Sequence, residues 1–290
     1  MREGTVLRSA CRIAARLADV LYGSRQLGTG KMRDFDLSGR VAIVTGGNGG
    51  IGLGMADALA RAGCAVSIWG RNAEKNAHAS KQLAAHGGAV DARICDVSDR
   101  QVVEAAFQAT LAEFGRVDAC FANAGIGGGG RRPFVERSEE EWRRMFAVNL
   151  DSVFHIFQLA ARHMTERAHR GDAFGRLVAT SSTASLFGTA RNEHYAATKA
   201  AINALVRALA VELARYGTTA NAILPGWIKS EMTAGIMGNE KFLANVMPRI
   251  PMRRFGEAED FGGIAVYLAS KASSYHTAEC FVIDGGYSAF

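Results

Sequence analysis

Short apolar runs alternate along the chain with longer amphipathic segments, and this alternation constrains the fold more than any other feature. Runs such as residues 41–44 (V-A-I-V) are apolar throughout, which is typical of strands buried on both faces of a sheet. Strand, helix and strand in succession predict a parallel sheet with helices on both sides. The expected strands span residues 41–44, 65–69, 89–94, 117–122, 176–181, 218–224 and 279–284.

The segments between these runs have the periodicity and the stop signals of helices. Gly63 and Gly115 directly follow two of them, as expected for glycine at a helix C-terminus. No linker rich in proline, serine or charge divides the chain after residue 40. The sequence therefore predicts one α/β domain over residues 32–290, with a Rossmann-type doubly wound parallel sheet. The expected helices span residues 51–62, 73–86, 100–114, 139–163, 193–215 and 257–270.

A glycine-rich turn separates the first expected strand from the first expected helix. The run T-G-G-N-G-G-I-G, from Thr45 to Gly52, satisfies both G-x-G-x-x-G and G-x-x-x-G-x-G. Glycine lets the backbone turn sharply and lets a pyrophosphate approach the N-terminus of the helix. A tight turn in a glycine-rich chain is the simpler reading, but the position between strand and helix favours nucleotide binding.

The end of the second expected strand is where such a fold selects between NAD and NADP. An acidic residue there would bind the ribose hydroxyls of NAD, whereas this chain has Trp69, Gly70, Arg71 and Asn72. A guanidinium forms charge-assisted hydrogen bonds with phosphate. Arg71 therefore predicts NADP, and NAD stays the alternative because Asn48 adds no second cation from the glycine-rich turn.

Tyr195 and Lys199 lie four residues apart in an expected helix, so their side chains share one face. A tyrosine phenol has a pKa of about 10 in water, and a nearby ammonium favours its deprotonated form. The pair is therefore suited to exchange a proton with a carbonyl or an alcohol. An ordinary solvated pair on a helix surface has the same spacing, so this pair alone does not decide the function.

Several separated motifs, in the same order, resemble those of the short-chain dehydrogenase/reductase family over about residues 36–290. They include the glycine-rich turn, the C-D-V-S-D segment beginning at Cys95 and the N-A-G motif beginning at Asn123. The residue before that motif is Ala122, where many members have asparagine. The resemblance implies hydride transfer between a nicotinamide and a ketone or secondary alcohol. It also implies four catalytic residues, Asn149, Ser182, Tyr195 and Lys199.

The resemblance assigns a role to each catalytic residue. Tyr195 exchanges the proton of the substrate oxygen, and Lys199 stabilises the phenolate and holds the ribose hydroxyls of the cofactor. Ser182 orients the substrate oxygen, and Asn149 holds a water that links the lysine to solvent. The adjacent His194 diverges from Tyr195 on the helix, so we interpret it as a packing or rim residue.

The cofactor contacts follow from the same resemblance. Asp96 matches an aspartate that meets the adenine, and the P-G pair at Pro225 and Gly226 lies beside the nicotinamide. Ser230 stands where a threonine commonly touches the carboxamide, and its hydroxyl preserves that contact. The implied contacts are Thr45, Gly46, Asn48, Gly50, Ile51, Gly52, Arg71, Asp96, Val97, Asn123, Ala124, Gly125, Tyr195, Lys199, Pro225, Gly226, Ile228 and Ser230.

Substrate selection is expected in residues 183–194 and 227–252, outside the shared motifs. The second segment is rich in Met and Ile, which predicts a mobile lid over a partly apolar pocket. A sugar, a polyol and a steroid-like substrate all stay open. A 3-oxoacyl-thioester reductase is an alternative, with Arg131 and Arg132 facing an acidic carrier. A non-catalytic dinucleotide sensor is another, although a sensor has no chemical need for the serine, tyrosine and lysine.

Charge and cysteine usage exclude other classes. The net charge is +6, but residues 1–31 alone carry six basic and two acidic residues, so the remainder carries only +2. This balance argues against nucleic-acid binding. The five cysteines have no C-x-x-C spacing and the histidines no metal-binding motif, which predicts a reducing, cytoplasmic location and no metal. The expected long helices resemble the assembly faces of the family, which implies a homo-tetramer or homo-dimer.

Residues 1–31 differ in composition from the rest of the chain. Arg8, Arg12 and Arg16 repeat every four residues, which suits an amphipathic transit-like or membrane-surface helix. A weakly ordered basic extension is the simpler interpretation and the one we favour, with the catalytic domain beginning near Met32. Membrane association is therefore not expected.

Overall fold

Seven parallel strands form one sheet in the computed structural model, which describes residues 33–127 and 132–289. The strand order is β3-β2-β1-β4-β5-β6-β7, so the connections reverse direction between β1 and β4. The doubly wound parallel sheet predicted from the sequence is confirmed. The strands are β1 Val41–Thr45, β2 Ala65–Gly70, β3 Val90–Ile94, β4 Ala119–Ala122, β5 Gly175–Thr180, β6 Thr218–Pro225 and β7 Cys280–Ile283.

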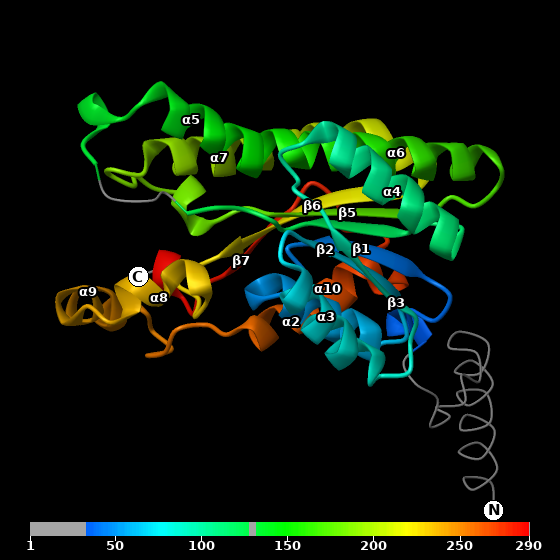
Figure 1. The fold of residues 1–290 in the computed structure, drawn as a ribbon, viewed down its shortest axis with the longest axis horizontal. Helices are drawn as coiled ribbons and strands as arrows, with labels where there is room; N and C mark the ends of the chain where they lie inside the picture. Colours follow the sequence, from blue (N-terminus) through cyan, green and yellow to red (C-terminus); the bar gives the residue numbers. More distant parts are fainter. Residues whose placement is uncertain (1–32, 128–131, 290) are drawn as a thin grey trace, which may run out of the picture. The chain divides into compact units, whose positions relative to one another are not determined.

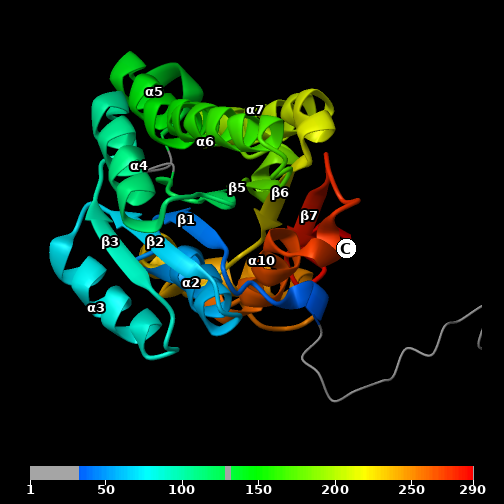
Figure 2. The same ribbon diagram turned by 90° about the vertical axis from the view of Figure 1, so that its right-hand side faces the viewer.

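Helices cover both faces of this sheet, as Figures 1 and 2 show. One face carries α4, α5, α6 and α7, and the other carries α2, α3 and α10. Each layer encloses its own apolar core: Phe107, Phe157 and Leu177 belong to the first, Leu59, Phe121 and Phe261 to the second. The helices are α2 Gly50–Arg61, α3 Ala73–Ala84, α4 Arg100–Phe114, α5 Glu139–Phe146, α6 Ser152–His169, α7 Glu193–Leu213 and α10 Gly262–Ala269.

The long helix expected over residues 139–163 is interrupted. A π-helical turn, Ala147–Asp151, separates α5 from α6, and α6 continues to His169. A π turn inserts one residue into the helical ladder, which the apolar periodicity of the sequence does not reveal. The helix expected over residues 257–270 likewise begins as a 3-10 turn, Ala258–Phe261, before α10.

Residues 227–252, the expected lid, contain two short helices that were not predicted from the sequence, α8 Glu231–Met237 and α9 Glu240–Val246. They pack on a third, smaller apolar cluster around Ile250, Phe255 and Tyr287. The mobility of this segment stays a prediction.

Two expectations concern residues that the structure does not describe. The basic extension, residues 1–31, and Arg131 in the loop after β4 both lie outside the described residues. Within the described part of the chain, no helix is long and apolar enough to cross a membrane.

Candidate active site

The carboxyl ends of β1, β4 and β5 meet at the point where the strand order reverses, which is where such sheets bind ligands. The Thr45 hydroxyl accepts hydrogen bonds from the backbone N–H groups of Asn123 and Ala124, at 2.9 and 3.0 Å. The Asn123 amide donates to the Thr45 carbonyl at 3.0 Å and accepts from the Thr180 hydroxyl at 3.0 Å. These bonds join three strand ends into one rigid edge.

The glycine-rich turn folds tightly against this edge. A Cβ at Gly52 would lie 2.2 Å from the Gly46 carbonyl oxygen and 2.5 Å from the Asn123 amide nitrogen. No side chain fits there without displacing the turn. The loop between β1 and α2 therefore depends on glycine for its close backbone approach, as a pyrophosphate-binding turn does.

Lys199 lies on α7 and points into the same edge. Its side chain is buried, and its Nζ donates to the Thr180 carbonyl oxygen at 2.7 Å. Burial lowers the pKa of Lys199 to about 8, because the ammonium loses most of its hydration. The residue still carries its charge for most of the time at neutral pH.

Tyr195 lies one turn before Lys199 on α7, with the lysine Nζ 5.6 Å from the centroid of its ring. Burial raises the pKa of the Tyr195 phenol, and a hydrogen bond with the Ser182 hydroxyl lowers it in part. The expectation that the Lys199 neighbour lowers this pKa is therefore wrong in direction. The reason is desolvation, which outweighs the Ser182 bond while the ammonium is bound to Thr180.

Ser182 follows β5 and caps a 3-10 turn, Thr183–Ser185, where its hydroxyl accepts from the Ala184 N–H at 3.1 Å. The same hydroxyl interacts with the Tyr195 phenol. The structure therefore places Ser182, Tyr195 and Lys199 together, although thirteen or more residues separate the serine from the pair.

Asn149 lies in the π-helical turn between α5 and α6 and is fully buried. Its amide accepts from the Ile126 N–H at 2.8 Å and donates to the Ile126 carbonyl at 3.0 Å. It thereby fixes the backbone that follows Asn123, Ala124 and Gly125. That Asn149 also holds a water beside Lys199 stays a prediction.

The opposite end of the site is polar and faces α3. Arg71 follows β2, and its Nη1 lies 4.0 Å from the Asp96 carboxylate. Two hydrogen bonds from Ser98 and the Arg71 charge lower the pKa of Asp96. A Cβ at Gly70 would lie 2.2 Å from the Asn48 amide nitrogen, so glycine is required beside that residue. Asn48 in turn donates to Asn76 at 2.7 Å.

A cavity of about 300 Å³ joins this polar end to the glycine-rich turn. Two charged residues that the sequence analysis missed also line it, Lys75 of α3 and Glu231 of α8, and they form an ion pair. The position of Lys75 in the first turn of the helix that follows Arg71 is a signal that would have found it. The residues that line this cavity are Gly46, Asn48, Trp69, Gly70, Arg71, Asn72, Lys75, Cys95, Asp96, Val97, Ala124, Gly125 and Glu231.

Other predicted cofactor residues are absent from the lining of this cavity, and their contact with a cofactor stays a prediction. Thr183 donates to the Pro225 carbonyl at 3.3 Å, and Gly226 donates from its N–H to Ile283 at 3.0 Å. Ile228 is buried, and Ile51 is half-buried against the same apolar core. Ser230 precedes α8, where its hydroxyl and its N–H both contact the Thr233 hydroxyl.

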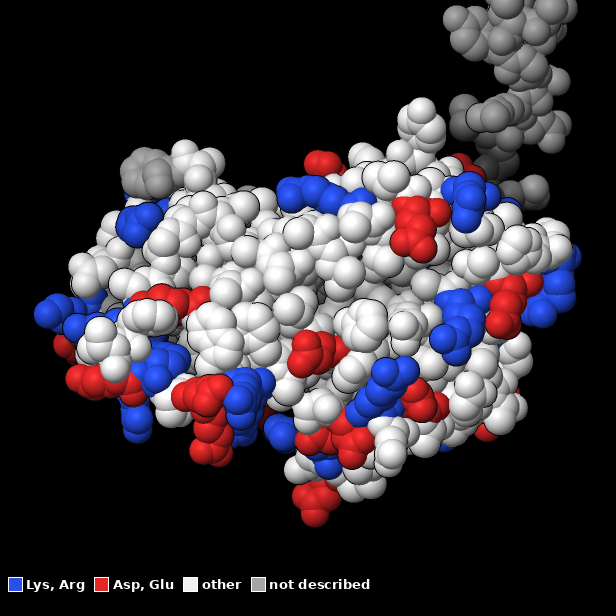
Figure 3. Space-filling model, turned by 90° about the horizontal axis from the view of Figure 1, so that it is seen from above, with Lys and Arg blue, Asp and Glu red and all other residues white. Residues whose placement is uncertain are grey.

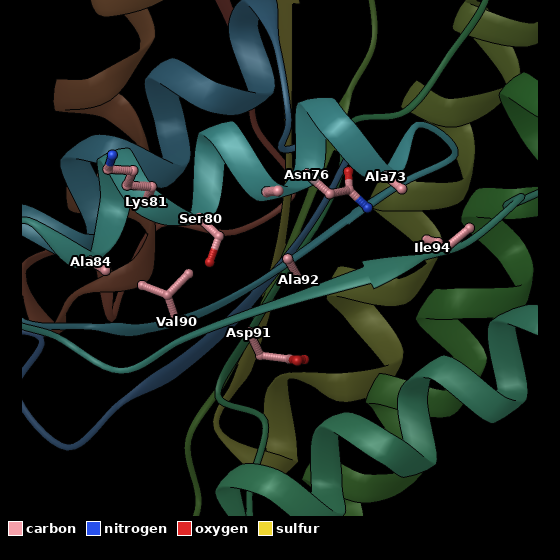
Figure 4. Close-up of a pocket in the computed structure, with 10 residues that line it drawn as sticks. Ala73, Asn76, Ser80, Lys81, Ala84, Val90, Asp91, Ala92 and Ile94 are labelled. Carbon is pink, nitrogen blue, oxygen red and sulfur yellow. The ribbon is translucent and has the colours of Figure 1, made fainter.

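A second hollow, of about 600 Å³, lies between α3 and the edge strand β3, as Figure 4 shows. Its lining consists of small and aliphatic side chains with Asn76, Ser80, Lys81 and Asp91 among them. None of the predicted catalytic or cofactor residues lines this hollow.

Comparison with known proteins agrees with this geometry. Residues 46–288 match a family model described as enoyl-(acyl carrier protein) reductase. The chain is 35% identical over 252 residues to gluconate 5-dehydrogenase of Gluconobacter oxydans, covering 87% of this chain and 96% of that protein. The chain belongs to the short-chain dehydrogenase/reductase family. It is an oxidoreductase that transfers a hydride between a nicotinamide dinucleotide and an alcohol or keto group.

Two further relatives of this dehydrogenase/reductase differ in substrate. A 3-oxoacyl-(acyl-carrier-protein) reductase of Chlamydia pneumoniae is 35% identical and covers 87% of this chain and 98% of its own. A gluconate 5-dehydrogenase of Burkholderia cenocepacia, solved in complex with NADP and tartrate, has a TM-score of 0.82. Its sequence is 34% identical, covering 89% of this chain and 98% of its own.

The residues of this dehydrogenase/reductase fit a dinucleotide. The turn at Gly52 leaves no room for a Cβ, the cavity beside it is polar, and Arg71 and Lys75 line its far end. The enzyme therefore has a tight glycine turn, a polar cavity beside it and a buried lysine at one edge of the sheet, an arrangement that suits a nicotinamide dinucleotide.

Proposed function

We propose that this enzyme interconverts a ketone and a secondary alcohol with NADP in preference to NAD, with Tyr195 as general acid and base. The observation that carries the proposal is the convergence of the Tyr195 phenol, the Ser182 hydroxyl and the buried Lys199 at one strand edge. A structural role alone does not account for an ammonium buried in a position that lowers its pKa to about 8.

When bound, the nicotinamide supplies or accepts the hydride. Ser182 holds the substrate oxygen beside the phenol, and Tyr195 donates its proton to that oxygen as the carbonyl is reduced. Because burial raises the pKa of Tyr195, the phenol is protonated at neutral pH and is ready to act as the acid. Alcohol oxidation needs the phenolate, so its rate is expected to rise with pH. Lys199, while protonated, supplies a positive charge that stabilises the phenolate.

The preference for NADP is supported by Arg71, which lines the cavity at a position where an acidic residue would favour NAD. Lys75 lines the same end, together with the acidic Asp96 and Glu231. Arg71→Ala is expected to raise the Kd of NADPH about 10-fold and to change the Kd of NADH little, because only NADPH has the 2′-phosphate. Arg61→Ala, an exposed arginine on α2 paired with Asp57, is the control. Equal or tighter binding of NADH by the unaltered enzyme would contradict the preference.

For the substrate we propose a polyhydroxylated keto acid, as the similarity to gluconate 5-dehydrogenases suggests. Arg249, stacked 4.6 Å over the Tyr287 ring beside Phe187 and Trp227, offers a cation within residues 227–252, where substrate selection is expected. The second candidate is a 3-oxoacyl thioester, favoured by the similarity to a carrier-protein reductase and by exposed Leu186 and Phe187. NADPH oxidation with 5-keto-gluconate, an acetoacetyl thioester and a steroid ketone distinguishes them, and activity with the thioester alone would overturn the first choice.

We also propose a homo-dimer or homo-tetramer that assembles through α6 and α7, in the cytoplasm. The helical face seen in Figure 3 has few charged side chains along its middle, and α6 and α7 expose Phe154 and Val211. The four described cysteines are free thiols, which suits a reducing compartment. Light scattering of the full chain is expected to give the mass of two or four copies. A single-copy mass would contradict the assembly.

A further inference from the structure

An ion pair between distant parts of the chain crosses the mouth of the cofactor cavity. Lys75 lies in the first turn of α3, and Glu231 is the first residue of α8, 156 positions later. Both side chains line the cavity of about 300 Å³ that also holds Arg71 and Asp96. The pair therefore lies at the site itself and not on a remote surface.

The positions of both residues are set by local hydrogen bonds. The Asn72 side chain accepts from the Lys75 N–H at 2.9 Å, which starts α3 directly after Arg71. Arg71, just before the helix, and Lys75, in its first turn, thus line one cavity. On the other side, Ser230 lies 3.6 Å from where a Cβ of Gly50 would be, so α8 begins beside the glycine-rich turn.

The two cations of this cavity are not equivalent. Arg71 lies 4.0 Å from Asp96, whose Oδ1 already accepts two bonds from Ser98. Lys75 is paired closely with Glu231, whose side chain is 84% exposed and makes no other hydrogen bond or ion pair with the described residues. A phosphate monoester carries a charge of about −1.5 to −2 and three acceptor oxygens. Such a group attracts Lys75 and repels the Glu231 carboxylate.

We propose that Lys75 is a second cationic ligand for the 2′-phosphate of NADP, and that Glu231 is the counter-ion which this phosphate displaces. Glu231 then weakens the binding of NADP(H) in the unaltered enzyme and limits how strongly NADP is preferred. NAD(H) has no 2′-phosphate and leaves the pair in place. The inference rests on the proposed preference for NADP and adds the residues that determine how much more tightly NADPH binds than NADH.

The test measures the direct binding of NADPH and of NADH to the full chain, by cofactor fluorescence or calorimetry and without any substrate. Lys75→Met is expected to weaken NADPH about 10-fold and to leave NADH within about twofold. Glu231→Gln is expected to tighten NADPH several-fold, again without an effect on NADH. In the Lys75→Met background, Glu231→Gln is expected to tighten NADPH less than it does in the unaltered enzyme, because only the repulsion between the phosphate and the carboxylate is then removed.

Two matched variants control for general changes of charge. Lys81→Met removes a lysine from the other end of α3, and Glu240→Gln removes the first acidic residue of α9. Both are expected to leave the Kd of NADPH within about twofold.

The outcomes separate this inference from the function on which it rests. Tighter binding of NADH than of NADPH by the unaltered enzyme overturns the preference for NADP and this inference with it. A preference for NADPH that is unchanged in both Lys75→Met and Glu231→Gln overturns this inference alone. So does a Glu231→Gln variant that tightens NADH and NADPH equally.

Discussion

The strand-end edge and the segment of residues 227–252 build the two sides of one site in different ways. At the edge, Thr45, Asn123 and Thr180 are linked by hydrogen bonds to backbone and to each other, and Lys199 is anchored on the same strand end. The other side rests on a small apolar cluster around Ile250, Phe255 and Tyr287, separate from the two main cores.

This difference indicates how the enzyme divides its tasks. Proton transfer needs groups held within fractions of an ångström, which the sheet and α7 provide. Substrate selection needs a surface that varies without disturbing the sheet, and we propose that residues 227–252, which rest on their own small cluster, provide it. Changes at the edge should therefore abolish chemistry, whereas changes in the segment should alter substrate affinity.

The largest effect is expected for Tyr195→Phe. The variant lacks the acid that protonates the substrate oxygen, so kcat should fall by about 100-fold or more while the Kd of NADPH stays within about threefold. Tyr216→Phe, in the turn after α7, is the matched control and should keep full activity. Near-normal turnover by Tyr195→Phe would place the chemistry elsewhere.

A second effect concerns stability at the edge. Burial lowers the pKa of Lys199 from its usual value to about 8, so between pH 8 and 10.5 the unfolded chain holds more protons at this residue than the folded enzyme. Below pH 8 the folded enzyme holds a buried charge. Lys199→Met removes this buried charge and also removes the hydrogen bond to the Thr180 carbonyl. The gain exceeds the loss, so the free energy of unfolding at pH 7 should rise by on the order of 2 kcal/mol.

This gain should shrink as the pH approaches 10, where the unaltered lysine is neutral in the folded enzyme. Denaturant titrations of both proteins at pH 6, 7, 9 and 10 measure it. A difference that is independent of pH would show that the side chain acts through packing alone.

A smaller effect is expected on the other side of the site. The Trp227 ring packs edge-on against Phe242 of α9 at 4.9 Å and faces Tyr287 at 6.4 Å. Trp227→Ala should loosen α9 and raise the KM for the carbonyl by about 10-fold, with kcat changed much less. Trp142→Ala, on α5, is the control. A loss confined to kcat would contradict the division of tasks.

The smallest effect is expected from removing residues 1–31, which we propose to be an extension that takes no part in catalysis. The described site draws its residues from position 45 onward. Kinetic constants of the shortened chain should stay within about twofold, and binding to anionic vesicles should be weak with or without the extension. Strong vesicle binding that depends on these residues would support the membrane-surface alternative instead.

The sequence predicted the sheet and the glycine-rich turn because both depend on local patterns. Apolar runs mark buried strands, and the turn from Thr45 to Gly52 needs glycine wherever the backbone approaches itself. The π-helical turn at Asn149 was not predictable, since it leaves the helical periodicity of residues 139–163 almost unchanged.

Interactions between distant positions were also beyond the sequence. Lys75 and Glu231 are 156 residues apart, and only the folded sheet brings α3 and α8 to one cavity. The pKa of Tyr195 illustrates the same limit: spacing indicated a lysine neighbour, but burial decides the direction of the shift.

Hydride transfer coupled to the Tyr195 proton is tested most directly by a single turnover with NADPH that carries deuterium at both C4 positions of the nicotinamide and a ketone that the enzyme reduces. The site predicts that the product alcohol carries deuterium on its carbinol carbon, and that Tyr195→Phe binds the cofactor but forms almost none of this product in the same time. Product without deuterium, or equal deuterium transfer by Tyr195→Phe, would contradict it.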